Sequence, residues 1–463
     1  MAGIGFELKK LFKKEGIFNG LKASVYSTIV TIGPTLISIA LIISFNMLLK
    51  FFGVSVIKRD LFQVTLMYSF VFAFILTSGY SMVLSRYIAD KIFVKDYEDI
   101  RASLYGSIVT IVGIGSIVGS IFYWKSDLPL LYKLFAYSLF IENIIQIVLS
   151  TYVTALKNVK VIVLGFVISF IISIICFIIF ANLLNIDMVL EAVISVSIGF
   201  LFLILILYKE IEKHFKIGSK NYFEFLSYYK KYYSLFLVNL FYALGLYIHT
   251  FLFWANKEVD LVIENTYVYA PTYDIAAFYA LIVTLPTMII FIVKIETVFF
   301  EKYTKYFFCI NNGASYRDIE LIKKDMVDSL YKELMYLMSI QLVISIASIV
   351  IGNKLLVNLG FTLEMLDIFY ILVLGYYLVN IIFVIITILL YFDYRKGALL
   401  SSVSLFVLNG LFTFISIKLG SDYYGIGVFI SGVVSICIAF KILERFIKNM
   451  DYYIFCENAK WSI

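Results

Sequence analysis

The chain has 463 residues and a formal net charge of +6, and 62% of its residues are hydrophobic whereas only 15% are charged. Soluble domains are about half apolar and about a quarter charged. A water-soluble fold could not bury this much apolar surface, so the composition excludes a soluble globular protein and predicts one embedded in lipid. The four cysteines are scattered without a CxxC pair, which argues against a disulfide framework or a metal site.

The first 23 residues precede the first apolar run and carry several lysines. In "MAGIGFELKKLFKKEGIFNGLKA" the residues Ile4, Leu8, Leu11 and Phe12 fall near one helical face, with lysines between them. This spacing predicts an amphipathic helix over residues 1–23 that lies on the inner leaflet of the membrane. The alternative is a basic flank that orients the first span without forming a surface helix.

Twelve apolar stretches are each long enough to cross a bilayer, which requires about 20 residues. They lie near 24–49, 61–85, 102–124, 130–156, 161–182, 188–208, 233–255, 275–299, 333–353, 364–391, 398–417 and 424–444. These runs are too long for barrel strands and lack their alternation, so they predict an all-α polytopic membrane protein. If the N-terminus lies in the cytoplasm, most of the 38 lysines and arginines fall on inner segments, which places both termini in the cytoplasm.

A basic segment at the middle of the chain separates six spans from six. It predicts an N-terminal lobe over 24–208, a cytoplasmic linker over 209–232, a C-terminal lobe over 233–447 and a cytoplasmic tail over 448–463. Transporters are commonly built from two such bundles, with a binding site between them near the midplane of the membrane. On this pattern alone, channels and membrane-embedded enzymes remain open.

Motifs for nucleotide and metal chemistry are absent from the sequence. It contains no GxxxxGK[ST] motif and no HExxH motif, and its two histidines, His214 and His249, are far apart along the chain. We therefore expect no P-loop hydrolysis of nucleotides, no metal and no cofactor. We also expect that the protein is not an enzyme.

Polar residues recur in the fourth span, in "SLFIENIIQIVLS". Ser138, Glu142 and Gln146 are spaced by four residues and share a helical face, with Asn143 beside them. Ionisable groups are costly inside a membrane, so this face predicts a water-filled cavity that binds a polar substrate or a coupling cation. The alternative is contact between helices, with a neutral or paired Glu142.

The seventh span contains "VNLFYALGLYIHTF", in which Asn239, Tyr242 and His249 lie within about 80° of each other around a helix. An aromatic ring beside an amide and an imidazole suits a sugar, because the ring covers an apolar face while the polar tips meet hydroxyl groups. Tyr370 and Tyr377 repeat the pattern in the tenth span. The alternative is a packing seam whose polar tips reach the membrane interface.

The eighth span ends in "FIVKIETVFFEKY", which places two charges near its cytoplasmic end. Lys294 is expected to extend to the lipid headgroups, with a role in the cavity or gate as the alternative. The shorter Glu296 is expected to face protein, as a gate partner of Arg86 or as a packing anchor. Pro286 within this span and Pro34 within the first span each remove a backbone hydrogen bond and permit a bend.

Four stretches of the sequence resemble the Pel exopolysaccharide transporter (PelG) family. They are "MAGIGFELKKLF", "SRYIADKIF", "YDIAAFYALIVTLPTMIIFIVKIETVFFEKY" and "YFDYRKGALLSSVSLFVLNGLFTFISIKLGSDYYGIG". The resemblance implies the fold of the multidrug/oligosaccharidyl-lipid/polysaccharide (MOP) exporter superfamily, which has twelve helices in two six-helix lobes around a central cavity. It implies no catalytic residue. The positions that match the family pattern are Arg86, Asp90, Tyr273, Asp274, Pro286, Glu296 and Thr297.

The same resemblance implies that the chain moves Pel, an N-acetylhexosamine-rich biofilm polysaccharide, across the bacterial cytoplasmic membrane, by alternating access or by threading during synthesis. The implied partners are a cytoplasmic glycosyltransferase and membrane proteins that include a cyclic-di-GMP receptor, without nucleic acid. Two other functions stay open. One is an ion-coupled antiporter of small molecules or drugs with the same fold, and the other is a non-transporting scaffold of a polysaccharide synthase.

Overall fold

The computed structural model describes residues 17–183, 186–216, 218–293 and 298–457. Within these residues, twelve helices are long and apolar enough to cross a membrane, which confirms the predicted number of spans. The amphipathic helix predicted over 1–23 lies mostly outside the described residues, and its described part forms the beginning of the first long helix.

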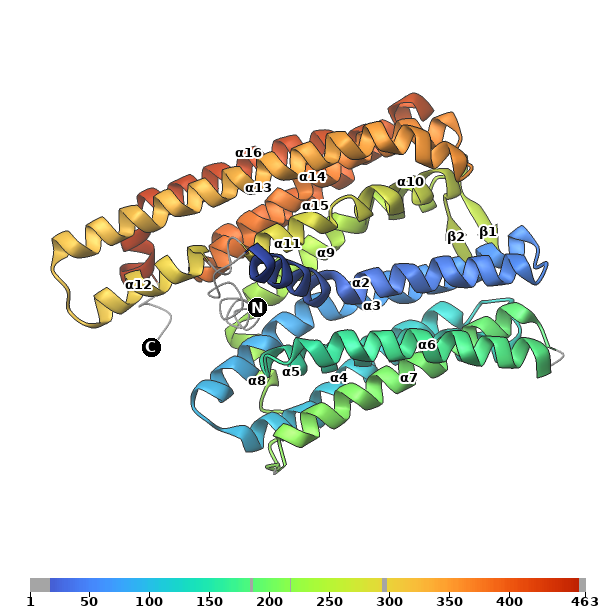
Figure 1. Cartoon of the computed structure of the whole chain (residues 1–463), viewed down its shortest axis with the longest axis horizontal. Coiled ribbons are helices and arrows are strands. Elements are labelled where there is room, and N and C mark those ends of the chain that lie inside the picture. Colours follow the sequence, from blue (N-terminus) through green and yellow to red (C-terminus); the bar gives the residue numbers. More distant parts are fainter. Residues whose placement is uncertain (1–16, 184–185, 217, 294–297, 458–463) are drawn as a thin grey trace. The chain divides into compact units, whose positions relative to one another are not determined.

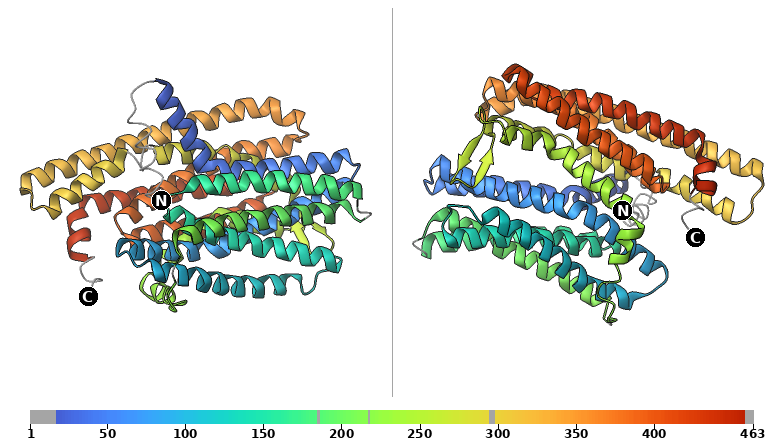
Figure 2. Two further views of the ribbon diagram at one scale, coloured as in Figure 1. Left: turned by 60° about the horizontal axis from the view of Figure 1, so that its bottom comes forward. Right: turned by 180° about the vertical axis from the view of Figure 1, so that it is seen from behind.

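The first half of the chain forms six long helices joined by short turns (Figure 1). They are α2 (Ile17–Phe51), α3 (Val56–Phe93), α4 (Tyr97–Tyr123), α5 (Leu130–Ala155), α6 (Val159–Leu183) and α7 (Met188–His214). α5 packs against α3, α4, α6 and α7, so it is the central helix of this bundle. Figure 2 shows these five helices alongside one another. α7 begins where the Asp187 side chain accepts a hydrogen bond from the Val189 amide at 3.0 Å, an N-cap that satisfies a donor left free at the helix start.

The second half is also helical, apart from one small hairpin. Its elements are α8 (Leu226–Lys231), α9 (Tyr233–Trp254), β1 (Leu261–Ile263), β2 (Tyr267–Tyr269), α10 (Pro271–Ile282), α11 (Leu285–Val293), α12 (Phe300–Asn311), α13 (Tyr316–Asn358), α14 (Leu363–Tyr391), α15 (Arg395–Leu419), η2 (Ser421–Tyr423), α16 (Ile426–Lys448) and η3 (Tyr452–Glu457). α14 packs against α10, α13, α15 and α16. The fourth span is therefore the central helix in each half.

The eighth span is interrupted just before Pro286. α10 ends at Ile282 and α11 begins at Leu285, so the chain leaves the helix for two residues. The proline ring cannot donate a backbone hydrogen bond and clashes with the carbonyl four residues earlier, which is that of Ile282. The first span behaves differently, because α2 continues as a helix through Pro34.

α13 is much longer than the predicted ninth span. Its 43 residues extend for about 65 Å at 1.5 Å per residue, about twice the thickness of the hydrocarbon core of a bilayer. The helix begins at a cap, because the Ser315 hydroxyl accepts from the Asp318 amide at 3.2 Å and donates to the Asp318 carboxylate at 2.6 Å. Residues 316–332, predicted as part of a polar inner segment, are thus the first turns of this helix.

Contacts within the chain divide the described residues into two compact units. The first unit comprises Ile32–Ala243 and Leu261–Tyr269, and the second comprises the other described residues. The central linker belongs to the first unit together with the beginning of α9. The lobe boundaries inferred from the sequence stay predictions.

The hairpin β1–β2 is a feature that the sequence pattern did not predict. Its strands are antiparallel, with Val262 opposite Val268. The Tyr68 hydroxyl of α3 donates to the Val268 carbonyl at 2.6 Å and accepts from the Val268 amide at 3.1 Å. The Tyr267 hydroxyl lies 2.8 Å from the Tyr123 hydroxyl on α4. Burial raises the pKa of Tyr267 to about 12, so the Tyr267 hydroxyl keeps its proton at neutral pH. These contacts attach the hairpin to the helices of the first unit.

The linker lies directly against α4 at Gly106. A Cβ atom added to Gly106 would lie 1.8 Å from the Tyr222 carbonyl oxygen, which is far inside van der Waals contact. Glycine is therefore needed here for close approach of two backbones. Gly113, two turns further along α4, has no atom within 4 Å of the same added Cβ.

These two glycines provide a matched test of how the linker packs. Gly106→Ala should lower the free energy of unfolding by about 1–3 kcal/mol, because the linker must move to admit the methyl group. Gly113→Ala should be neutral or stabilising by up to about 1 kcal/mol, since it adds helix propensity in open space. Thermal unfolding and trypsin cleavage within the linker measure both effects. Equal behaviour of the two variants would show that the linker does not rest on α4.

Candidate functional site: buried polar groups and the Lys91 cluster

Glu142 lies in the interior of the first unit, near the middle of α5. The residue is 3% exposed. Its Oε1 atom accepts hydrogen bonds from the Ser138 hydroxyl at 3.0 Å and from the Ser197 hydroxyl of α7 at 2.6 Å. Among the described residues, the Oε2 atom has no hydrogen-bond partner. The site is a buried carboxyl group of which one oxygen is satisfied twice and the other not at all.

The other residues of the predicted polar face on α5 are buried as well. Asn143 is 0% and Gln146 is 8% exposed. The Asn143 side chain donates to the Leu139 carbonyl at 3.0 Å, which is a bond within the helix. This face contains little exposed surface in the described state, and its assignment to a substrate cavity stays a prediction.

His249 of α9 is completely buried in the second unit. Its Nδ1 atom lies 2.8 Å from the Tyr273 hydroxyl of α10, and its Nε2 atom lies 3.1 Å from the Tyr376 hydroxyl of α14. A neutral imidazole has one donor and one acceptor nitrogen, so it can accept from one tyrosine and donate to the other. Three spans are thus joined at one imidazole ring.

Asp274 follows Tyr273 and is also buried. Its Oδ2 atom accepts from the Trp254 indole at 2.8 Å and from the Ala270 amide at 2.9 Å, while Oδ1 has no partner among the described residues. Tyr273 in turn stacks on Phe253, with ring centroids 3.6 Å apart. The family-pattern positions 273 and 274 therefore anchor the start of α10 to the end of α9.

The residues of the polar face predicted on the seventh span all lie on α9 and belong to two units. Tyr242 is buried and Asn239 is partly exposed, and both belong to the first unit. His249 belongs to the second unit, and its hydrogen bonds run to tyrosines of α10 and α14. The tyrosine of α14 that it meets is Tyr376, the neighbour of the Tyr377 named from the sequence.

The predicted gate is described only in part. Arg86 and Asp90 lie one turn apart on α3 and form an ion pair at 3.3 Å, and the Arg86 guanidinium lies 5.5 Å from the centroid of the Tyr232 ring. Both charged side chains are partly exposed, so this pair contributes little to stability. Lys294, Glu296 and Thr297 lie outside the described residues, and their roles stay predictions.

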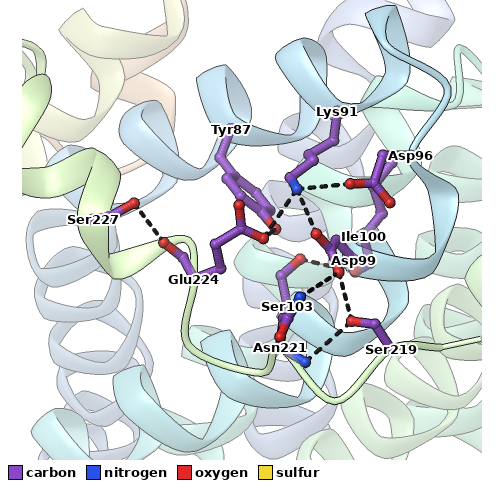
Figure 3. Close-up of polar contacts among 10 residues, drawn as sticks. All are labelled: Tyr87, Lys91, Asp96, Asp99, Ile100, Ser103, Ser219, Asn221, Glu224 and Ser227. Atoms are coloured by element: carbon purple, nitrogen blue, oxygen red, sulfur yellow. Dashed lines mark hydrogen bonds and ion pairs between the residues drawn. The ribbon is translucent and has the colours of Figure 1, made fainter.

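A charged cluster joins the linker to the ends of α3 and α4 (Figure 3). In this Lys91 cluster, the Lys91 ammonium contacts Asp96 at 2.8 Å, Asp99 at 2.5 Å and Glu224 at 3.0 Å. The side chains of Lys91 and Asp99 are 12% and 9% exposed. One cation is therefore held among three carboxylates, two of which come from the turn and start of α4 and one from the linker.

Asp99 also binds the linker directly. It accepts hydrogen bonds from the Ser219 hydroxyl at 2.6 Å and from the Asn221 side chain at 3.2 Å, and Figure 3 shows both linker residues turned toward it. The Ser219 amide donates to the Glu98 carbonyl at 3.2 Å. The linker is thus held in place by side-chain and backbone bonds.

Comparison with known proteins identifies the family of this chain. The sequence model of the PelG exopolysaccharide exporter family (EPS-E) matches residues 1–455. The chain belongs to the PelG family. This confirms the resemblance seen in the sequence motifs, whereas no curated protein sequence matches the chain.

The PelG-family chain shares its fold with solved transporters of the MATE and MOP groups. A point mutant of the Vibrio cholerae MATE transporter VcmN is 14% identical, with a TM-score of 0.65 over 97% of this chain and 98% of that chain. The eukaryotic MATE transporter AtDTX14 is 12% identical, with a TM-score of 0.64 over 92% and 96%. A MOP superfamily transporter from Pyrococcus furiosus is 14% identical, with a TM-score of 0.59 over 92% and 96%. At these identities the likeness establishes the fold alone.

Family and fold together make the PelG-family chain a multi-pass membrane transport protein. Proteins of this family and fold are transporters, which are not enzymes. The twelve spans, the membrane location and the role in transport follow from these matches.

Two groups in the PelG-family chain were missed by the sequence reasoning. Glu191 of α7 is 1% exposed, in the first turn of the helix. An acid inside the apolar run "MVLEAVISV" was the available signal. The Lys91 cluster carried no such signal, because its charges lie in segments predicted as ordinary inner loops, where charge is expected.

Proposed function

We propose that the chain exports a Pel-type, N-acetylhexosamine-rich exopolysaccharide across the bacterial cytoplasmic membrane, with both termini in the cytoplasm. The match of the PelG family over residues 1–455 is the observation that carries this proposal. The excess of basic residues on the predicted inner segments supports the orientation. The chain then acts with a cytoplasmic glycosyltransferase and a membrane-bound cyclic-di-GMP receptor, as the family resemblance implies.

Tyr242 and Asn239 are proposed to line the route of the polymer. A sugar ring stacks on an aromatic face, and an amide both donates to and accepts from its hydroxyl groups. The two residues lie three positions apart on α9, so they share a helical face. Passage by alternating access and passage by threading both require such a face.

The alternative function is an ion-coupled antiporter of small molecules or drugs. The fold supports it, because solved relatives in structure include proteins described as multidrug resistance MATE transporters. A cation-binding carboxyl group in a span would serve such coupling. Substrate preference separates the two functions, since a drug transporter favours apolar cations whereas an exporter of polysaccharide favours neutral or amino sugars.

Transport by the purified protein in vesicles tests the proposal. We expect uptake of a labelled N-acetylhexosamine oligosaccharide, and we expect Tyr242→Ala to lower it about tenfold, since the loss of about 1.4 kcal/mol of stacking corresponds to that factor. Tyr233→Ala is the matched control, because this tyrosine lies on the same helix and is 59% exposed. Movement of a cationic drug without movement of the glycan would favour the antiporter instead.

A further inference from the structure

The hydrogen bonds of Glu142 are unequal between its two oxygens, and this inequality indicates the protonation state. We infer that Glu142 is a proton-binding site, which holds its proton on Oε2 in the described state and exchanges it when the surroundings of α5 and α7 change. The ligand is the proton itself, and the site consists of Glu142, Ser138 and Ser197.

The geometry fits a neutral carboxylic acid. Both serine hydroxyls donate to Oε1, at 3.0 Å and 2.6 Å, which is the arrangement expected for a carbonyl oxygen with two lone pairs. Oε2 accepts no hydrogen bond from any described residue. An ionised carboxylate carries charge on both oxygens and would leave half of that charge unsolvated, whereas a protonated acid carries only a hydroxyl group there.

The surroundings also lack a counter-charge. α5 packs against α3, α4, α6 and α7. The titratable groups that are buried or half-buried on these helices and on α5 itself are Arg59, Asp60, Tyr68, Tyr80, Tyr87, Asp90 and Lys91 of α3, Asp99, Arg101, Tyr105 and Tyr123 of α4, Cys176 of α6, Glu191, Tyr208, Glu210 and Glu212 of α7, and Tyr132, Lys133, Tyr137 and Tyr152 of α5. None of them forms a hydrogen bond or ion pair with Glu142 in the described part of the chain. The cations among them have other partners. Lys91 is held by three other carboxylates, and Arg101 pairs with Glu212 at 2.9 Å. Arg59 donates to Asn46, and Lys133 donates to the Ser126 carbonyl.

A metal ion fits the site less well than a proton. Among the described residues, no group of three or more His, Cys, Asp and Glu side chains could hold a metal ion. Sodium requires several oxygen ligands, and the described side chains that form hydrogen bonds with the carboxyl group are two serines, both of which donate to it. A single proton needs only the free lone pair of Oε2.

α7 extends the site toward a second buried acid. Ser197 and Glu191 are six residues apart on this helix, which is about 9 Å of rise. Glu191 is almost completely buried. A movement of α7 would therefore change the hydrogen bond to Glu142 and the position of a second group able to receive a proton.

This proposal rests on the proposed function only for the use of the proton. If the chain is a transporter, release of the proton from Glu142 provides the coupling between a proton gradient and the movement of substrate. The site itself is a property of the folded first unit and is measured without substrate.

Infrared spectroscopy of the purified protein tests the site directly. A neutral carboxylic acid has a carbonyl stretching band that a carboxylate lacks, so pH-difference spectra should contain a band that Glu142→Gln removes. Ser197→Ala should shift this band to higher frequency, because a hydrogen bond to the carbonyl oxygen is lost. Ser195→Ala is the matched control and should leave the band unchanged, since the buried Ser195 hydroxyl donates to the Glu191 backbone carbonyl at 2.7 Å.

Two outcomes would overturn the inference. One is a spectrum of Glu142→Gln that retains every carboxylic acid band of the wild type. The other is a band that responds to sodium and not to pH, which would assign a metal cation instead. If Glu142→Gln does not fold, the test is the Ser197→Ala variant alone. An unshifted carbonyl band in that variant would then overturn the inference.

A second measurement separates the site from its use. Vesicles that contain the wild-type protein and an internal pH-sensitive dye should show proton movement on addition of the labelled oligosaccharide, and Glu142→Gln should lose it. Proton movement by Glu142→Gln at the wild-type rate would refute coupling through this residue. Absence of glycan transport by the wild type, with the infrared band intact, would refute the proposed function and leave the proton site standing.

Discussion

Replacing Lys91 with methionine is expected to lower the free energy of unfolding by about 2–4 kcal/mol. The substitution leaves Asp96, Asp99 and Glu224 facing each other without their shared cation, and removal of one partner from a buried ion pair costs about 3–5 kcal/mol. We expect a somewhat smaller loss, because the side chains of Asp96 and Glu224 are 37% and 38% exposed and partly solvated. The linker should separate from α3 and α4 in the same variant.

Thermal or denaturant unfolding and trypsin cleavage of the linker measure this effect. Lys58→Met is the control, because it breaks one exposed pair with Asp187 in the same unit and should cost at most about 1 kcal/mol. The triple variant Lys91→Met, Asp99→Asn, Glu224→Gln should recover part of the loss, since it removes two of the three unpaired charges together with the lysine and leaves only the partly exposed Asp96. Equal stability of Lys91→Met and Lys58→Met would show that the Lys91 cluster does not hold the linker.

His249→Ala is expected to destabilise the second unit by about 3–5 kcal/mol. The substitution creates a cavity at a fully buried position and leaves the hydroxyls of Tyr273 and Tyr376 without their shared partner. Cavities of this kind cost about 2–5 kcal/mol, and each unsatisfied buried group adds to the loss. Because α9, α10 and α14 meet at this ring, transport should also fall.

Denaturant unfolding of the purified protein measures this loss, and the only other histidine provides the control. His214 lies at the exposed end of α7, so His214→Ala should change the free energy of unfolding by less than about 0.5 kcal/mol. Tyr376→Phe removes one hydrogen bond without a cavity and should cost about 0.5–1.5 kcal/mol. If His249→Ala is as stable as His214→Ala, the imidazole does not join the three spans.

Parts of the candidate sites could be predicted from the sequence, because charged residues are rare inside membrane spans. Glu142 stood out in an apolar run, and its spacing from Ser138 correctly placed a hydroxyl on the same face. The sequence did not indicate that Ser197 completes the site, since a serine in a span is ordinary and the partner is 55 residues away. The same limit applied to His249, whose tyrosine partners lie 24 and 127 residues further along the chain.

Loops were the least predictable part. The stretch between the predicted seventh and eighth spans has no pattern that predicts an element, yet Leu261–Ile263 and Tyr267–Tyr269 pair as strands and attach to α3 and α4. Three-residue strands carry no usable periodicity, and their stability here comes from contacts with Tyr68 and Tyr123. The linker is a similar case, because the sequence predicted a cytoplasmic connection over 209–232 but not its contacts with Lys91 and Asp99.

The sequence by itself determined that the chain has twelve membrane spans and that Pro34 and Pro286 permit bends, of which the structure shows a break only before Pro286. Both are local consequences of chain chemistry, since about 20 apolar residues satisfy a bilayer and proline cannot donate to a helix. Only the tertiary structure decided that Lys91 holds the linker, that His249 joins three spans and that one oxygen of Glu142 has no partner among the described residues. Those features depend on which side chains meet across helices. Such pairings are set by packing between segments that are distant in the chain, and local composition and periodicity contain no information about that packing.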